Sequence, residues 1–183
     1  MTEHGPRVRM IPHGDDRPRL VCPECRYVAY QNPLIVVGSV PVWQDRILLC
    51  RRAIEPCRGL WTLPAGFMEE QETTSEGAIR EALEEANATI EIDALLGIYQ
   101  LPRISQVHFF YRARLTSPLI AAGYESLEVA LFDWAEIPWH ELAFPTVRWA
   151  LADFDARRGQ TSFPPAGNPP AAQDDFVPPV KTA

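Results

Sequence analysis

The hydrophobic and polar positions of the chain predict one region of regular structure, between residues 34 and about 158. Aliphatic and β-branched runs at 34–43 and 46–50 flank the polar pair Gln44-Asp45, a pattern typical of a β-hairpin. Further runs of the same kind predict strands at 89–100, 106–115 and 128–134.

Two segments of this region have the periodicity of amphipathic helices. In the first, 73–86, Thr73 and Glu76 have the spacing of a capping box. Its apolar face is formed by Ala78, Ile79, Ala82, Leu83 and Ala86. In the second, 146–157, the apolar face is formed by Val147, Ala150, Leu151 and Phe154. The order strands, helix, strands, helix predicts an α+β fold, an α/β/α sandwich around a mixed sheet.

The two ends of the chain differ in composition from this region and predict three parts. Residues 1–33 are polar and rich in Arg and Pro around Cys22-Pro-Glu-Cys25, and residues 34–160 form the predicted domain. Residues 161–183 contain six prolines, whose nitrogens cannot donate regular backbone hydrogen bonds, and we expect this tail to be disordered.

Composition narrows the class of protein. With 183 residues, 46% of them hydrophobic, the chain can bury one core and a small appendage. No apolar run approaches the roughly 18–20 residues that span a bilayer, and the first residues lack the apolar segment of a signal peptide, so we expect no membrane partner and a cytoplasmic protein. A net charge of −7 argues against a nucleic-acid partner. A polyanionic small substrate would need bound cations and local arginines.

The first predicted helix carries an unusual cluster of acids. Seven glutamates and one basic residue, Arg80, lie between residues 69 and 85. Glu81 and Glu85 are like charges at i,i+4, with Glu84 on nearly the same face, an arrangement that costs a few tenths of a kcal/mol. Such a face supplies the hard oxygen ligands that Mg²⁺ or Mn²⁺ prefers. The alternative is a solvated acidic surface.

The spacing of the whole segment favours the metal interpretation. From Gly66 to Ala88 the chain resembles the Nudix hydrolase motif, G-x5-E-x7-R-E-U-x-E-E-x-G-U, where U is a bulky apolar residue. Every fixed position from Gly66 to Glu85 matches. The last Gly of the motif is Asn87 here, which we expect to adopt the left-handed conformation of a helix C-cap. The two U positions are alanines, Ala82 and Ala88.

The resemblance implies a role for each matching residue. Glu81, Glu84 and Glu85 would bind Mg²⁺ or Mn²⁺, with a backbone carbonyl of Ala65 or Gly66 as a further ligand. Glu72 and Arg80 would form an ion pair that orients these acids. The general base varies within the family, and the candidates here are Glu81, Glu85, Glu125 and Glu128.

The residues that would bind the substrate are less specific. Arg51, Arg52 and Arg103 are available to contact phosphates, although each alone is typical of a solvated surface charge. Trp61, just before the motif, would stack on a base or anchor the core.

The wider resemblance is to a Nudix subgroup with an N-terminal zinc ribbon, which includes pyrophosphohydrolases of FAD and ADP-ribose. It covers residues 19–151, and Pro102 has a spacing associated with ADP-ribose pyrophosphatases. The resemblance implies metal-dependent cleavage of such a nucleotide, yielding AMP with FMN or ribose 5-phosphate, by a homodimer. The alternatives are a pyrophosphatase that sanitises oxidised nucleoside triphosphates and a non-catalytic nucleotide sensor.

The ribbon itself is incomplete in this sequence. A full ribbon supplies two Cys pairs to Zn²⁺, whereas Cys22 and Cys25 form one pair. His4 is the candidate third ligand, and His13 is less well placed. The alternative is a degenerate ribbon without zinc.

Overall fold

The computed structural model describes residues 4–170. The chain divides into two compact units, residues 1–33 and 34–183. The first unit contains a small antiparallel sheet of order β1-β2-β3, formed by Val8–Met10, Arg19–Val21 and Val28–Ala29. The sequence pattern does not predict these strands, because two or three residues are too few to show alternation.

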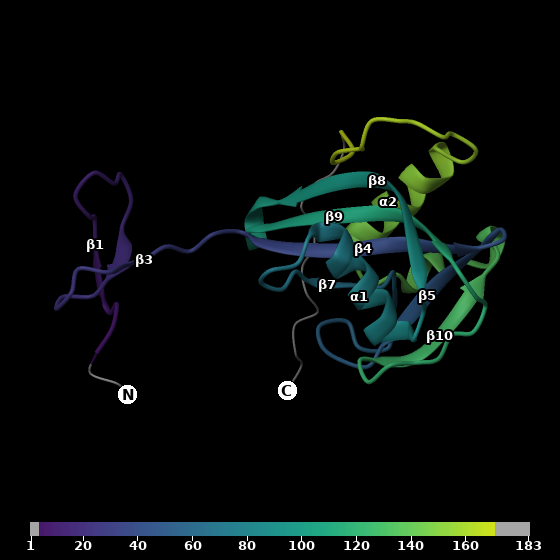
Figure 1. Cartoon of the computed structure of the whole chain (residues 1–183), viewed down its shortest axis with the longest axis horizontal. Helices are drawn as coiled ribbons and strands as arrows, with labels where there is room; N and C mark the ends of the chain where they lie inside the picture. Colours follow the sequence, from purple (N-terminus) through teal and green to yellow (C-terminus); the bar gives the residue numbers. More distant parts are fainter. Residues whose placement is uncertain (1–3, 171–183) are drawn as a thin grey trace. The chain divides into compact units, whose positions relative to one another are not determined.

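The second unit is built on one mixed sheet of order β10-β5-β4-β9-β8 (Figure 1). Strands β4 and β9 are parallel, and the other neighbours on this path are antiparallel. Two short strands lie off the path, where β6 pairs with β5 and β7 pairs with β4. The strands are β4 (Leu34–Trp43), β5 (Arg46–Arg52), β6 (Trp61–Thr62), β7 (Ala65–Phe67), β8 (Ile90–Leu101), β9 (Gln106–Leu115) and β10 (Ser126–Phe132).

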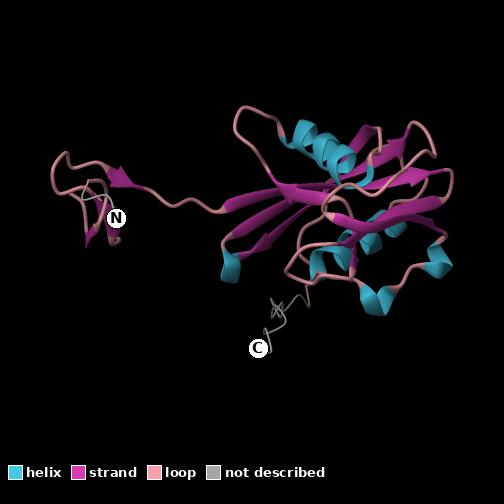
Figure 2. Ribbon diagram, turned by 90° about the horizontal axis from the view of Figure 1, so that it is seen from below, coloured by secondary structure: helices cyan, strands magenta, loops and turns pink. Residues whose placement is uncertain are grey.

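Helices α1 (Thr74–Ala86) and α2 (Pro145–Ala156) complete this unit (Figure 2). Each helix packs on its own hydrophobic cluster: Ala82 and Ala86 of α1 belong to one, and Val147 and Leu151 of α2 to the other. The predicted α+β class, with a mixed sheet and two helices, is confirmed, and the predicted strands and helices are found with ends shifted by at most two residues. No helix of residues 4–170 is long and apolar enough to cross a membrane.

The ends of α1 follow the expected chemistry. The Thr73 side chain accepts from the Glu76 backbone N–H, and the Glu76 carboxylate accepts from the Thr73 N–H, so the capping box is present. Asn87 is left-handed, with φ 47°, and its side chain donates to the Ala121 carbonyl at 3.0 Å. Asn87 therefore closes the helix where the motif has Gly, and it also ties the helix to the loop before β10.

The prediction of a disordered tail is wrong for the part that the structure describes. Ala166 forms a parallel bridge with Gly97 at the β8 edge of the sheet. The Asn168 side chain accepts from the backbone N–H of Gln100 and donates to its carbonyl, at 2.8 and 2.7 Å. Because Ala166 and Asn168 lie between the prolines, they supply the hydrogen bonds that proline nitrogens cannot. The remaining predicted tail, 171–183, lies outside the described residues.

Candidate active site

The acidic residues of α1 face the short strand β7. Glu81 and Glu85 are buried, at 7% and 5% exposure, whereas the side chain of Glu84 is half-exposed. Gly66 of β7 lies directly against the Glu81 carboxylate, and a Cβ on Gly66 would fall 2.4 Å from Glu81 Oε1. Any side chain at this position would therefore displace the Glu81 carboxylate.

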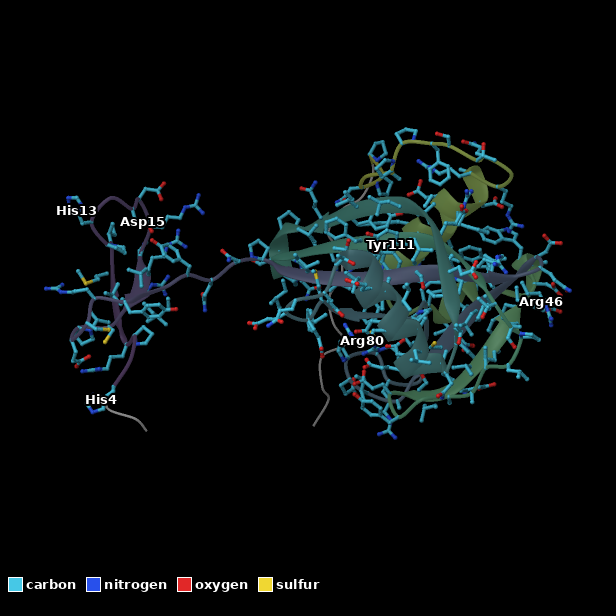
Figure 3. The ribbon with its side chains drawn as sticks, viewed as in Figure 1. His4, His13, Asp15, Arg46, Arg80 and Tyr111 are labelled. Carbon is cyan, nitrogen blue, oxygen red and sulfur yellow. The ribbon has the colours of Figure 1, made fainter. Side chains whose placement is uncertain are left out.

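Arg80, which is labelled in Figure 3, forms hydrogen bonds with three of the acidic residues. Its guanidinium donates to both carboxylate oxygens of Glu72, from Nε at 3.0 Å and from Nη2 at 2.8 Å. Its Nη1 donates to Glu81 at 2.7 Å and to Glu84 at 2.9 Å, and Nη2 also reaches the Phe67 carbonyl at 3.1 Å. The expected ion pair between Glu72 and Arg80 is present, and one planar guanidinium fixes the geometry of three acids.

Burial controls the charge of the two inner acids. Desolvation, with the nearby charge of Glu81, raises the pKa of Glu85 to about 8, although a hydrogen bond from the Ala65 backbone opposes this. Desolvation also raises the pKa of Glu81, against the opposing effect of Arg80. Glu85 Oε2 has no hydrogen-bond partner among the described residues. A buried carboxylate oxygen without a partner is costly, and a cation would stabilise its charged form.

Carboxylate oxygens are suitable ligands for a divalent cation, but those of Glu81, Glu84 and Glu85 do not converge on one position in this structure. Among residues 4–170, no three His, Cys, Asp or Glu side chains converge as metal ligands. Arg80 Nη1 lies between Glu81 and Glu84, contacting both. A cation at this face would compete with Arg80 for Glu81 and Glu84.

One cavity of about 480 Å³ opens beside the acidic face. Of the residues that the structure describes, six glutamates and two arginines line it: Glu55, Glu69, Glu81, Glu84, Glu85, Glu125, Arg52 and Arg80. This excess of negative charge would repel a diphosphate unless cations enter with it.

A second part of the cavity lining, which we call the sheet side, is mostly apolar. It consists of Val36, Leu101, Ile104, Gln106, His108 and Phe110. Strand register brings these residues together: Val36 is opposite His108 across the β4–β9 pair, and Leu101 is opposite Gln106 across the β8–β9 pair. The cavity thus joins a carboxylate wall to an apolar wall within one space.

Of the four predicted substrate-binding residues, Arg52 lines the cavity. Its guanidinium lies 5.0 Å from the centre of the Phe144 ring. Arg51 instead contacts the Gly59 carbonyl, and Trp61 is a core residue that meets Phe132 edge to face at 4.9 Å. Arg103 lies in the 3₁₀ turn Pro102–Ile104, beside residues that line the sheet side.

The two loop candidates for the general base are separated by the structure. Glu125 lines the cavity together with Glu81 and Glu85. Glu128 is exposed on β10, where its carboxylate lies 3.5 Å from Arg51. A bulge between Ser126 and Glu128 changes the register at this point, which a sequence pattern cannot show.

Sequence reasoning missed the sheet side and the start of α2. His108 and Gln106 are two residues apart on β9 and so face the same side of the sheet, but nothing in the sequence says which side meets a cavity. Phe144, Pro145, Thr146 and Val147 at the beginning of α2 also line the cavity. The alternation of side chains along β9, which puts Gln106 and His108 on one face, was the available sequence signal for this part of the site.

The predicted zinc ligands are only partly brought together. Hydrogen bonds from the Tyr27 backbone and from Cys22 lower the pKa of Cys25, so the two cysteines are neighbours. The Cys22 thiol donates to Glu24 at 3.0 Å. His4 and His13 lie at opposite ends of this unit (Figure 3). Within residues 4–170, His4 does not join the cysteines in a cluster of three metal-binding side chains.

Comparisons with known proteins agree with this architecture. The family model described as NUDIX domain matches residues 33–154, and the zinc-ribbon model described as Nudix N-terminal matches residues 5–31. The chain is 30% identical over 123 residues to the ADP-ribose pyrophosphatase of Methanocaldococcus jannaschii, covering 65% of this chain and 72% of that protein. It is 38% identical over 99 residues to the 8-oxo-dGDP phosphatase of Homo sapiens, covering 52% of this chain and 30% of that protein.

Among solved structures, the chain is similar to a NUDIX hydrolase from Nitrosomonas europaea. The two are 48% identical with a TM-score of 0.82, covering 88% of this chain and 93% of that one. An ADP-ribose pyrophosphatase from Streptococcus suis, 20% identical with a TM-score of 0.62 and covering 75% of this chain and all of that one, shares the fold. The family match over residues 33–154, together with the acidic helix α1 and the mixed sheet, establishes that this chain belongs to the Nudix hydrolases.

Proposed function

We propose that this Nudix hydrolase cleaves the diphosphate of a nucleoside diphosphate derivative in the presence of Mg²⁺ or Mn²⁺, with ADP-ribose as the preferred class of substrate. The observation that carries the proposal is that buried Glu81 and Glu85 line the same cavity as the mostly apolar sheet side. A nucleotide has the same division, since its diphosphate is charged and its base is planar and mostly apolar.

The residues that would hold the cation are Glu81, Glu84 and Glu85, with a backbone oxygen of Ala65 or Gly66. The unpartnered Oε2 of Glu85 supports this assignment, because that oxygen gains a partner when a cation binds. A bound divalent cation neutralises the diphosphate and lowers the pKa of a bound water molecule. In our proposal Arg80 and Glu72 keep the metal-binding acids of α1 oriented. Arg52, which also lines the cavity, contacts a phosphate of the substrate.

We assign the role of general base to Glu125, or to one of the acids of α1, rather than to Glu128. Glu125 faces the cavity, so its carboxylate is available to take a proton from the attacking water. Glu128 is held by Arg51 on the outer strand.

We favour ADP-ribose over an oxidised guanine nucleotide because the match spans a larger share of the relative that acts on ADP-ribose. The ADP-ribose pyrophosphatase of M. jannaschii is matched over 72% of its length, and the human 8-oxo-dGDP phosphatase over 30%. FAD is a second candidate substrate, because the N-terminal segment matches the ribbon model and the subgroup with such a ribbon includes FAD pyrophosphohydrolases.

The test is incubation of the full chain with Mg²⁺ and a panel of ADP-ribose, FAD, 8-oxo-dGDP and 8-oxo-dGTP, with products separated by chromatography. We expect AMP and ribose 5-phosphate from ADP-ribose. Turnover of the oxidised guanine nucleotides alone would replace our substrate assignment, and no product from any compound would refute the proposal.

A pair of variants tests the site itself. Glu85→Gln removes a metal ligand with little change in shape, and we expect kcat to fall by about two orders of magnitude or more. Glu136→Gln, an exposed acid on the 3₁₀ turn Trp134–Glu136, is the matched control and should retain activity. Equal activity in both variants would remove Glu85 from the metal site.

The resemblance also leads us to propose a homodimer, and zinc in the ribbon segment. Light scattering on the purified chain measures the first, with a monomer at micromolar concentration as the contrary result. Elemental analysis of zinc in the wild type and in Cys22→Ser measures the second.

A further inference from the structure

The sheet side of the cavity contains a polar pair, buried His108 and part-buried Gln106, that the proposed mechanism does not use. His108 is 9% exposed, and its ring lies 6.4 Å from Phe110 between ring centres. Its cross-strand neighbour Val36 is also 9% exposed. A histidine in such apolar surroundings needs hydrogen bonds to offset the water that it has lost.

The contact with Gln106 decides which ring nitrogen carries the proton. His108 Nε2 lies 2.9 Å from Gln106 Oε1, and an amide oxygen only accepts, so Nε2 donates. Burial lowers the pKa of His108 to about 4, so the ring is neutral near pH 7 and has one proton. That proton is on Nε2, and Nδ1 is therefore an acceptor.

Nδ1 is left without a partner. It is buried and has no hydrogen bond from any of the described residues. An acceptor in this position costs roughly 1–3 kcal/mol. Because His108 lines the cavity, a turn of its ring that exposes Nδ1 would let a donor from a ligand recover this cost. The pair therefore predicts a ligand that presents an N–H or O–H group to an otherwise apolar wall.

We propose that the sheet side binds the base of the substrate and that His108 Nδ1 accepts a hydrogen bond from the amino group of an adenine-type base. This inference rests on the proposed function. A base suits the wall better than a ribose does, because aliphatic and aromatic side chains pack on a planar ring but leave sugar hydroxyls unpaired. Gln106 acts as a positioning residue, since it holds the tautomer that makes Nδ1 an acceptor.

The same geometry disfavours a keto group at that position of the base. A carbonyl oxygen would place one acceptor against another, and both would stay unpaired. His108 is therefore a specificity-determining residue that separates amino purines from keto purines. It is distinct from the carboxylates that act on the diphosphate.

The test compares AMP with purine riboside 5′-monophosphate, which is AMP without the 6-amino group. Neither has an anhydride bond, so binding is measured by calorimetry with Mg²⁺ and without turnover. The wild type should bind AMP about tenfold more tightly or better, since a site built around a hydrogen bond rejects an analogue that lacks it. In His108→Phe, which keeps a ring of similar size, the ratio of the AMP affinity to the analogue affinity should fall below about twofold.

Two further variants separate a specific role from a structural one. Gln106→Met removes the acceptor that fixes the tautomer, and the ratio of the AMP affinity to the analogue affinity should fall. His140→Phe, an exposed histidine in the 3₁₀ turn Trp139–Glu141, should keep the wild-type ratio. Thermal melts establish that each variant is folded.

The ring nitrogens of His108 give a second, direct measurement. In ¹⁵N NMR of the free protein, Nε2 should be protonated and Nδ1 unprotonated, and AMP should move the Nδ1 resonance more than the analogue does. Equal binding of the two nucleotides by the wild type, no binding of either, or an unchanged ratio in His108→Phe would each overturn the inference. Absence of ADP-ribose hydrolysis refutes the proposed function instead, because the AMP comparison needs no turnover.

Discussion

The Glu81 carboxylate lies against the α-carbon of Gly66, so close that one added methyl group would overlap both of its oxygens, at 2.4 and 2.5 Å. Strand β7 is fixed at this point by pairing with β4, where Gly66 is opposite Val37. Because this pairing holds the strand and the contacted atoms are the end of a flexible side chain, we expect an added methyl group to displace the Glu81 carboxylate.

Gly66→Ala should therefore displace Glu81 from the cavity while leaving the fold largely intact. We expect kcat/KM to fall by about 100-fold, because small displacements of catalytic groups cost that much. Gly167→Ala, which has open space around its Cβ, is the matched control. Steady-state kinetics and Mn²⁺ binding would measure the effect, and wild-type values in Gly66→Ala would contradict it.

Arg80→Lys should lower activity although the charge is kept. Lysine cannot reproduce the two parallel hydrogen bonds to Glu72 while contacting Glu81 and Glu84. Loss of such an orienting partner typically costs about 10–100-fold in metal affinity or activity, and we expect that range. Arg114→Lys, in an exposed ion pair with Glu91, is the control. Equal metal affinity in the two variants would argue against the orienting role.

The general base can be located by two isosteric changes. Glu125→Gln should reduce kcat by about 10²–10⁴-fold if Glu125 takes the proton, with KM changed little. Glu128→Gln should lose only its contact with Arg51 and stay within a few-fold of the wild type. The reverse order of effects would return the role to Glu128.

The stability of the metal-free protein should depend on pH through Glu85. Its pKa is about 8 in the folded chain against an ordinary value of 4.5, so between these values the native state holds more protons than the unfolded state. Stability therefore falls as pH rises from about 4.5 to 8. In chelator, Glu85→Gln should flatten this slope and be the more stable protein at pH 8, by about 3 °C or more in Tm.

Mg²⁺ should reverse the trend, because the cation competes with the proton for the same carboxylate. The gain in Tm on adding Mg²⁺ is expected to be larger at pH 8 than at pH 5. Parallel pH profiles for the wild type and Glu85→Gln would show that burial of Glu85 does not control this part of the stability curve.

The packed part of the tail should contribute to stability. The guanidinium groups of Arg112 and Arg157 lie 4.7 and 5.5 Å from the centre of the Phe163 ring. Phe163→Ala should lower the free energy of unfolding by about 1–3 kcal/mol through lost packing and cation–π contacts. Leu119→Ala, at an 80% exposed position, serves as the control and should be nearly neutral. Urea denaturation measures both.

The sequence by itself determined whatever depends on neighbours along the chain. The main strands follow from aliphatic and β-branched runs, and the fold class follows from the order of strands and helices. The capping of α1 at Thr73 and Asn87 follows from the residues at its two ends. The spacing of Glu81, Glu84 and Glu85 on one face, and of Arg80 beside them, is a property of helix geometry and needs no tertiary structure.

Only the tertiary structure decided which distant residues share the cavity. It selected Arg52 over Arg51, although the two are adjacent, because alternate residues of a strand face opposite sides. It separated Glu125 from Glu128 through a bulge, buried Trp61 in the core and paired the tail with β8. It also placed His108 opposite Val36 on the wall of the cavity, since that contact depends on the register of two strands about seventy residues apart.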